Sequence, residues 1–156
     1  MNKKRQILDV FYRKSEEFED AGDLDKAIAW IDKAIAIYPN DAEIWAVKGQ
    51  YLIRDQKFEE AIICFDRAIE LSPQFATDYM KCCNRAFCFQ ELGKFEEAIE
   101  ALNKAIEIDP NHSEDWYNKG HCLRKIGKFE DAIVCFDKAI EMDPNDIGSW
   151  TWLKDD

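Results

Sequence analysis

The feature that most constrains this chain is a phrase that occurs four times, as DKAIAWIDKAIAIYPN, EEAIICFDRAIELSPQ, EEAIEALNKAIEIDPN and EDAIVCFDKAIEMDPN. Its copies share an alanine near the start and a proline near the end: Ala27, Ala61, Ala98 and Ala132, then Pro39, Pro73, Pro110 and Pro144. Successive prolines are 34, 37 and 34 residues apart. A repeat of this period indicates a stack of small supersecondary units, each of which buries its apolar face against its neighbours.

Each repeat contains two segments with apolar or small residues at helical spacing, separated by a short polar turn. In three repeats the turn contains Gly22, Gly93 or Gly127, and glycine tolerates the left-handed conformation that commonly ends a helix. The proline then stops the second helix. Small residues at equivalent places in the first helices, Ser15, Gly49, Ala86 and Gly120, are expected to face the alanines of the phrase. No segment alternates with a period of two, so we predict an all-α solenoid.

Tryptophan, glycine, alanine, phenylalanine and proline recur at set intervals in the second and fourth repeats. These residues are Trp45, Gly49, Ala61, Phe65, Ala68 and Pro73, then Trp116, Gly120, Ala132, Phe136, Ala139 and Pro144. The pattern resembles the tetratricopeptide repeat (TPR) family, whose unit is a helix-turn-helix of about 34 residues. The resemblance covers 8–146 and implies a right-handed superhelical solenoid, a single array over 1–156. Its four full repeats are 8–41, 42–75, 79–112 and 113–146.

Two segments depart from the regular spacing. Residues 76–78 are an insertion before the third repeat. Either the fifth helix begins early, which we favour because 74–92 contains no glycine or proline, or the connection is longer, with Thr77 or Asp78 as the helix cap. The segment 147–156 contains Trp150 in phase with Trp116. It is either a capping stub or a truncated fifth repeat.

The resemblance implies that the first helices line a concave groove for an extended peptide or a helix. The candidate partner-binding residues are Tyr12, Glu16, Ala46, Gln50, Ile53, Cys83, Asn84, Phe87, Tyr117, Asn118, His121 and Arg124. This groove is acidic in its first quarter, apolar in the middle and mixed at the end, where Arg124 and Lys125 add positive charge. We therefore expect a ligand with apolar anchors and with basic residues toward the N-terminal end. The alternative is that these side chains are solvated or cover an internal helix.

Composition argues against several classes of function. The 32 acidic and 21 basic residues give a formal net charge of -11, which would repel nucleic acid. No apolar run approaches membrane-spanning length, and we expect a cytoplasmic protein with six reduced cysteines. We predict no cofactor, no metal and no catalytic residues, since pairing Cys83 or Cys88 with His121 would need a defined electropositive environment.

Two classes of function remain after these exclusions. The favoured one is a non-enzymatic scaffold or adaptor that binds a peptide or a helix in the groove. The alternative is a structural self-assembly module, in which the apolar C-terminal end around Trp150 forms a homo-oligomer.

Overall fold

The computed structural model describes residues 3–144, the side chains of residues 77, 79 and 81 excepted. The described residues contain eight α-helices and no strand. The chain divides into two compact units, Met1–Phe75 and Ala76–Asp156, and each is described by itself. The segment 147–156, and with it Trp150, lies outside the described residues.

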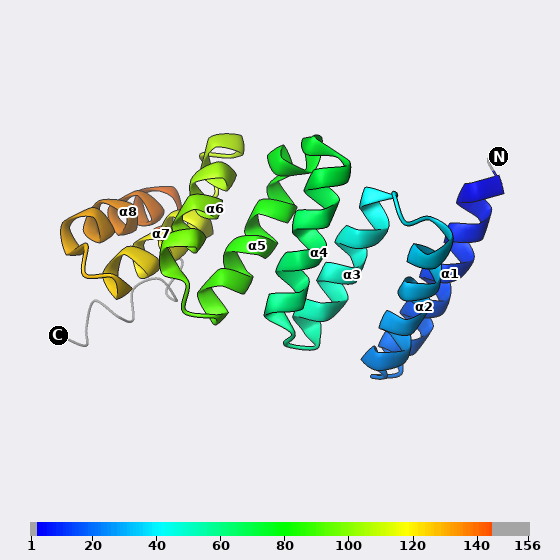
Figure 1. The fold of residues 1–156 in the computed structure, drawn as a ribbon. Coiled ribbons are helices and arrows are strands. Elements are labelled where there is room, and N and C mark those ends of the chain that lie inside the picture. Colours follow the sequence, from blue (N-terminus) through cyan, green and yellow to red (C-terminus); the bar gives the residue numbers. More distant parts are fainter. Residues whose placement is uncertain (1–2, 145–156) are drawn as a thin grey trace. The chain divides into compact units, whose positions relative to one another are not determined.

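Helices pack in antiparallel pairs within each unit (Figure 1). Unit 1 contains α1 (Lys3–Asp20), α2 (Leu24–Ile37), α3 (Ala42–Arg54) and α4 (Phe58–Leu71). Unit 2 contains α5 (Tyr79–Glu91), α6 (Phe95–Ile108), α7 (Ser113–Lys125) and α8 (Phe129–Met142). Each second helix ends two residues before a proline, because the residue that precedes proline is disfavoured in the α conformation. The predicted all-α fold of paired helices is confirmed, and the superhelical path stays a prediction.

The turns inside the pairs are three residues long and share one hydrogen-bond pattern. In the second pair the amide of Gln56 donates to the carbonyl of Ile53 at 3.0 Å, and the amide of Lys57 donates to that of Leu52 at 2.9 Å. This is a Schellman motif, which places one residue in the left-handed region. That residue is Gly22, Gly93 or Gly127 in the other pairs, at φ 75°, 70° and 79°. Gln56 adopts φ 59°, a backbone conformation that is strained for any residue with a Cβ atom.

Two glycines let the paired helices approach closely. A Cβ atom on Gly49 would lie 2.8 Å from Cζ of Phe65, and one on Gly120 would lie 2.6 Å from Cε1 of Phe136. In both pairs the nearest atoms belong to a phenylalanine ring of the facing helix. At the equivalent place of the third repeat, Ala86 lies in one core cluster with Ala98, as the repeat pattern predicts. Helix ridges pack into facing grooves, and a missing side chain on α3 or α7 leaves the space that a ring of α4 or α8 fills.

Trp45 and Trp116 tie their repeats to the preceding connection. The indole Nε1 of Trp45 donates to the carbonyl of Pro39 at 2.8 Å, and that of Trp116 donates to the carbonyl of Pro110 at 3.0 Å. In the third repeat Cys82 stands at the equivalent place, and its thiol donates at 3.4 Å to the carbonyl six residues before it. A hydrogen bond to the carbonyl six residues earlier is thus kept in the third repeat, with a thiol as the donor in place of an indole.

The insertion before the third repeat does not extend a helix. The helix α5 begins at Tyr79, the place equivalent to Ala42 at the start of α3. The connection instead contains a short 3₁₀ helix, η1 (Pro73–Thr77). The favoured expectation of an early helix start is therefore wrong. The reason is tertiary packing: Phe75 is 8% exposed and packs with Ala46 and other small residues in the core of unit 1.

Candidate functional site

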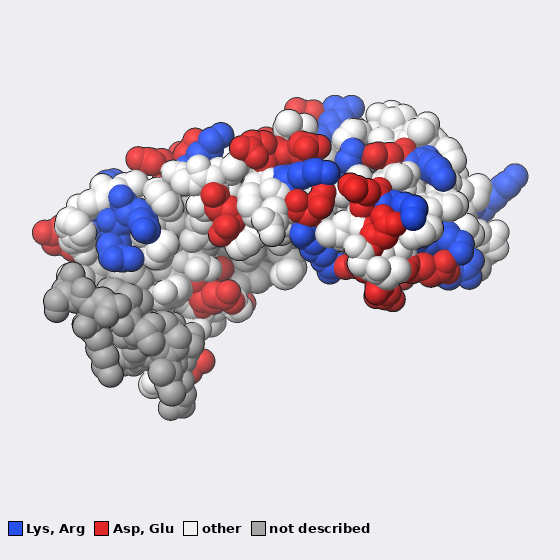
Figure 2. Space-filling model, turned by 90° about the horizontal axis from the view of Figure 1, so that it is seen from below, with Lys and Arg blue, Asp and Glu red and all other residues white. Residues whose placement is uncertain are grey.

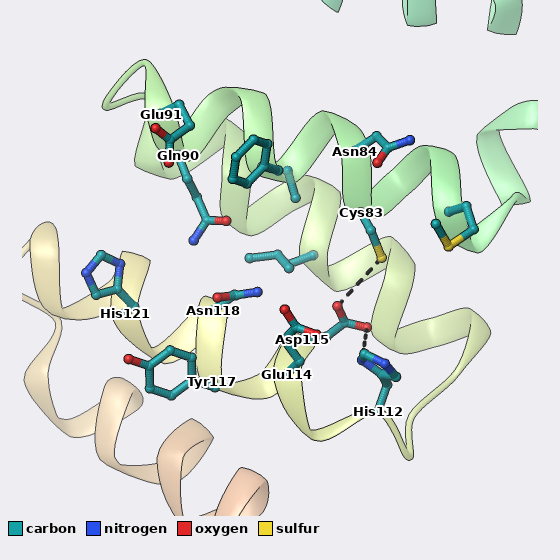
Figure 3. A pocket seen from close by; sticks show the side chains of 14 residues that line it. Cys83, Asn84, Gln90, Glu91, His112, Glu114, Asp115, Tyr117, Asn118 and His121 are labelled. Atoms are coloured by element: carbon teal, nitrogen blue, oxygen red, sulfur yellow. Dashed lines mark hydrogen bonds and ion pairs between the residues drawn. The ribbon is translucent and has the colours of Figure 1, made fainter. Parts of the chain in front are cut away.

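A cavity of about 600 Å³ lies in unit 2, where α5 and α7 contribute most of the lining side chains (Figure 3). Residues three or four apart on a helix share a face, so each helix presents several side chains to it. Six candidate partner-binding residues line the cavity: Cys83, Asn84 and Phe87 from α5, with Tyr117, Asn118 and His121 from α7. The structure therefore brings these six residues together.

The apolar part of the lining includes Phe87 and Met80, whose exposed fractions are 43% and 58%. Tyr117 also lines the cavity, and its ring packs against the buried ring of Phe136 with 5.8 Å between the centroids. This contact with a core residue fixes the position of the tyrosine ring. Exposed large apolar side chains gathered in a concave surface are typical of a binding site.

A buried carboxylate belongs to the same lining. Asp115 is 3% exposed, and the thiol of Cys83 donates to its Oδ1 at 3.6 Å. Its Oδ2 lies 3.7 Å from Nδ1 of His112, and within the described chain this oxygen accepts no hydrogen bond. Asp115 was not among the candidate residues. The repeat register does not single it out, because Ile44 at the equivalent place of the second repeat is fully buried whereas Val10 of the first repeat is 44% exposed.

The cavity is lined by negative rather than mixed charge. Glu91 and Glu114 line it together with Asp115, whereas its lining in the described part of the chain includes no lysine or arginine. Burial, followed by the charge of Arg124, lowers the pKa of His121, so this imidazole is neutral at pH 7. Arg124 is itself exposed and lies outside the lining, so the positive charge expected at this end does not enter the cavity.

A second cavity, of about 330 Å³, lies in unit 1 and is lined from α1 and α3. Three candidate residues line it, Tyr12, Glu16 and Gln50, together with Glu19 and Glu43. Burial, followed by neighbouring carboxylates, raises the pKa of Tyr12 to about 12, so its phenol keeps its proton. The carboxylates predicted for the first quarter of the groove are present here, and Arg54, which also lines this cavity, forms an ion pair with Glu19.

Tyr51 belongs to the lining of the unit 1 cavity and was not among the candidate residues. Its hydroxyl donates to Oγ of Ser15 at 3.1 Å, and Ser15 in turn donates to the carbonyl of Tyr12 at 2.7 Å. Tyr51 occupies the repeat position of Cys88 and Cys122, which are both fully buried. The register could therefore have placed it at the helix contact.

Charged side chains elsewhere on the surface form pairs of opposite sign. Figure 2 shows Asp and Glu interspersed with Lys and Arg over much of the face that it draws. In unit 1, Nζ of Lys48 lies 2.7 Å from Asp32, and Nζ of Lys4 lies 2.8 Å from Asp41. Exposed pairs of this kind contribute about 0–1 kcal/mol each. The unit 2 cavity differs, since the lining residues that the structure describes there include three carboxylates and neither lysine nor arginine.

Two further candidates do not lie where the sequence predicts. Ala46 is 1% exposed and packs in the core of unit 1 with Phe75, so its methyl group is unavailable to a partner. The prediction is wrong there because the 3₁₀ connection folds over this face of α3. Ile53 is half-buried and does not line the unit 1 cavity.

The cysteines behave as small packing residues. All six are free, and five of them are buried. Burial raises the pKa of the Cys64 and Cys122 thiols to about 11 and that of Cys88 to about 12, so these groups stay protonated. Residues 3–144 contain no cluster of three or more His, Cys, Asp or Glu side chains able to hold a metal ion. None of the helices described is both long and apolar enough to cross a membrane.

Models of the family described as "Tetratricopeptide repeat" match residues 12–75 and, as two further repeats, 81–112 and 113–146. The chain belongs to this family. The models place their repeats over the paired helices of both units, which confirms the resemblance seen in the sequence. TPR proteins are typically protein–protein interaction modules and are generally non-catalytic.

Several known proteins are similar to parts or most of the chain. A peroxisomal targeting signal receptor of Saccharomyces cerevisiae is 35% identical over 66 residues, which are 42% of this chain and 10% of the receptor. A crystal structure of MamA has a TM-score of 0.80 at 21% identity, covering 87% of this chain and 78% of the other. MamA 41-end from Desulfovibrio magneticus RS-1 has a TM-score of 0.86 at 19% identity, covering 98% and 83%. At these identities the MamA structures show the fold alone.

Proposed function

We propose that this TPR protein is a non-enzymatic adaptor that binds a peptide or a helix of a partner protein at the unit 2 cavity. The observation that carries the proposal is the convergence of exposed Phe87 and Met80 with polar side chains of α7 in one cavity of about 600 Å³. An amphipathic segment needs apolar anchors beside groups that satisfy its polar atoms. The membership of the TPR family supports a protein ligand over a small molecule.

A pull-down with two matched variants tests the adaptor. Phe87→Ala removes an exposed ring inside the cavity, whereas Phe129→Ala removes a ring that is 59% exposed on α8, outside it. We expect Phe87→Ala to lose partners that the wild-type protein and Phe129→Ala retain, with helical circular dichroism unchanged. Equal recovery of partners by both variants would refute the proposed site.

Self-assembly is a second candidate, and an observation on α8 favours it. Phe129 and Ile133 are 59% and 57% exposed, whereas their equivalents on α6, Phe95 and Ile99, pack against a core cluster that includes Cys122 of α7. An uncovered apolar face of this kind can pair with a second copy of the chain. Light scattering coupled to size exclusion, over a concentration series, tests it. This candidate requires an oligomer that Phe129→Ala weakens and Phe87→Ala leaves intact.

We also propose a reducing location such as the cytoplasm. The free cysteines support it, because they pack as small apolar side chains with protonated thiols. Mass spectrometry of the protein alkylated at lysis in its native host tests this, since a disulfide between native cysteines would contradict it.

A further inference from the structure

We propose that the unit 2 cavity is selective for a peptide segment that carries a lysine or arginine side chain next to an apolar residue. This inference rests on the adaptor function and names the chemistry of its ligand. The first argument is charge complementarity, since Glu91, Glu114 and Asp115 line the cavity and none of its described lining residues is a lysine or an arginine. His121 does not change this balance, because its lowered pKa keeps it neutral at pH 7.

Asp115 is the second and independent argument. A buried carboxylate is costly unless its oxygens are paired. The thiol of Cys83, a weak donor, contacts Oδ1, and Oδ2 accepts no hydrogen bond from any residue that the structure describes. Nδ1 of His112 lies 3.7 Å away from Oδ2, which is too long for a hydrogen bond. Oδ2 is itself enclosed by the protein, so Asp115 acts on a ligand through its negative charge and not through a direct hydrogen bond.

The field of Asp115 reaches the cavity with little screening. Its side chain is 4% exposed, whereas Glu91 and Glu114 are exposed to solvent. Salt screens exposed charges more strongly than buried ones. Asp115 therefore supplies a negative potential that persists at moderate salt, and the two glutamates supply exposed carboxylates that can pair with an ammonium or guanidinium group.

The apolar part of the lining fits the rest of such a segment. Lysine and arginine carry aliphatic stems that bury along apolar surfaces while the charged head stays near water or carboxylates. Phe87 and Met80 offer that surface, and the ring of Tyr117 offers a face that attracts a cation. A neighbouring apolar residue of the ligand would cover the remaining exposed ring of Phe87.

Binding of three fluorescein-labelled peptide libraries to the full chain, measured by anisotropy, tests the selectivity. The libraries share random apolar positions and differ only at a central residue, which is Lys or Arg in the first, Gln in the second and Glu in the third. We expect the basic library to bind about tenfold more tightly than the Gln library, and the Glu library to bind most weakly. The preference should fall between about 50 mM and about 500 mM NaCl.

Variants assign the preference to this cavity. Glu114→Gln combined with Glu91→Gln removes two exposed carboxylates without disturbing the core, and we expect it to abolish most of the preference while affinity for the Gln library is kept. Glu130→Gln, an exposed glutamate of α8 outside the cavity, is the matched control and should keep the preference. Asp115→Asn removes the buried charge without changing the shape of the side chain, and its helical signal is checked before binding is compared.

The outcomes separate this inference from the adaptor function. Equal affinity for the basic and Gln libraries overturns the inference and leaves the adaptor standing. A preference that survives both in the double glutamate variant and in a folded Asp115→Asn variant also overturns it, because the basic group would then bind elsewhere. If no library binds at any concentration tested, the inference fails together with the peptide-binding function at this cavity.

Discussion

Replacing Gly49 by alanine tests whether a missing side chain sets the distance between α3 and α4. In an exposed helix this change stabilises by about 1 kcal/mol, because glycine is the poorer helix former. Here the new Cβ would lie 2.8 Å from Cζ and 2.9 Å from Cε1 of Phe65, a core residue that is 1% exposed. Overpacking a core costs about 1–3 kcal/mol. Two contacts this short favour the upper value, so we expect a net loss of about 2 kcal/mol.

A second substitution shows whether the loss comes from the ring. In the third repeat the positions of Gly49 and Phe65 are occupied by Ala86 on α5 and Leu102 on α6, which pack in one cluster. Alanine is thus paired there with a side chain smaller than phenylalanine. The double variant Gly49→Ala, Phe65→Leu copies that pair into unit 1. In a double-mutant cycle measured by urea unfolding and circular dichroism, we expect the two changes to couple favourably by about 2 kcal/mol. A gain in stability from Gly49→Ala alone, as in an exposed helix, would refute the close-packing argument.

Three further perturbations have defined outcomes. Gln56→Gly relieves the strain of a side chain in the left-handed backbone conformation and should raise the free energy of unfolding by about 1 kcal/mol. Gly93→Ala introduces that strain and should lower the free energy of unfolding by a similar amount. An unchanged urea midpoint for either variant would contradict the assignment of strain to these turns. Trp116→Phe deletes the indole donor to the carbonyl of Pro110 and should cost about 1 kcal/mol in the same assay, and a neutral result would mean that water replaces the bond. Because the native pKa of His121 lies below the ordinary 6.5, the stability that it contributes is complete above pH 6.5 and is lost as pH falls through the lowered value. His121→Asn should therefore flatten the stability profile below pH 6.5, and parallel profiles of the two proteins would argue against it.

The positions of the helices in the sequence could be predicted because all four repeats share nearly the same period. The alanines and prolines of the repeated phrase mark each second helix, and the glycines mark three of the four turns. Gln56 takes the same conformation without being glycine, because the flanking helices impose the turn. The start of α5 could not be predicted from local sequence, since the burial of Phe75 in unit 1 decides it.

The candidate site was predictable only in part, for a related reason. Counting along one helix identifies residues that share a face, and it brought Phe87 of α5 and Tyr117 of α7 into the list. It does not show which side chains a connection covers, as with Ala46, or which polar group lies buried between helices, as with Asp115. Comparison with the other repeats does not recover Asp115, because at that place Ile44 is fully buried but Val10 is 44% exposed.

The indole hydrogen bonds suggest how such an array could lengthen. Donor and acceptor, Trp45 with Pro39 or Trp116 with Pro110, lie only six residues apart in the chain. A tandem duplication of any 34-residue stretch that keeps those seven residues together would carry both atoms into the new junction. Growth of the gene by whole repeats then needs no compensating mutation at the joint. This holds even for a duplication of 42–75, which begins between proline and tryptophan, because Pro73 then lies six residues before the copied Trp45.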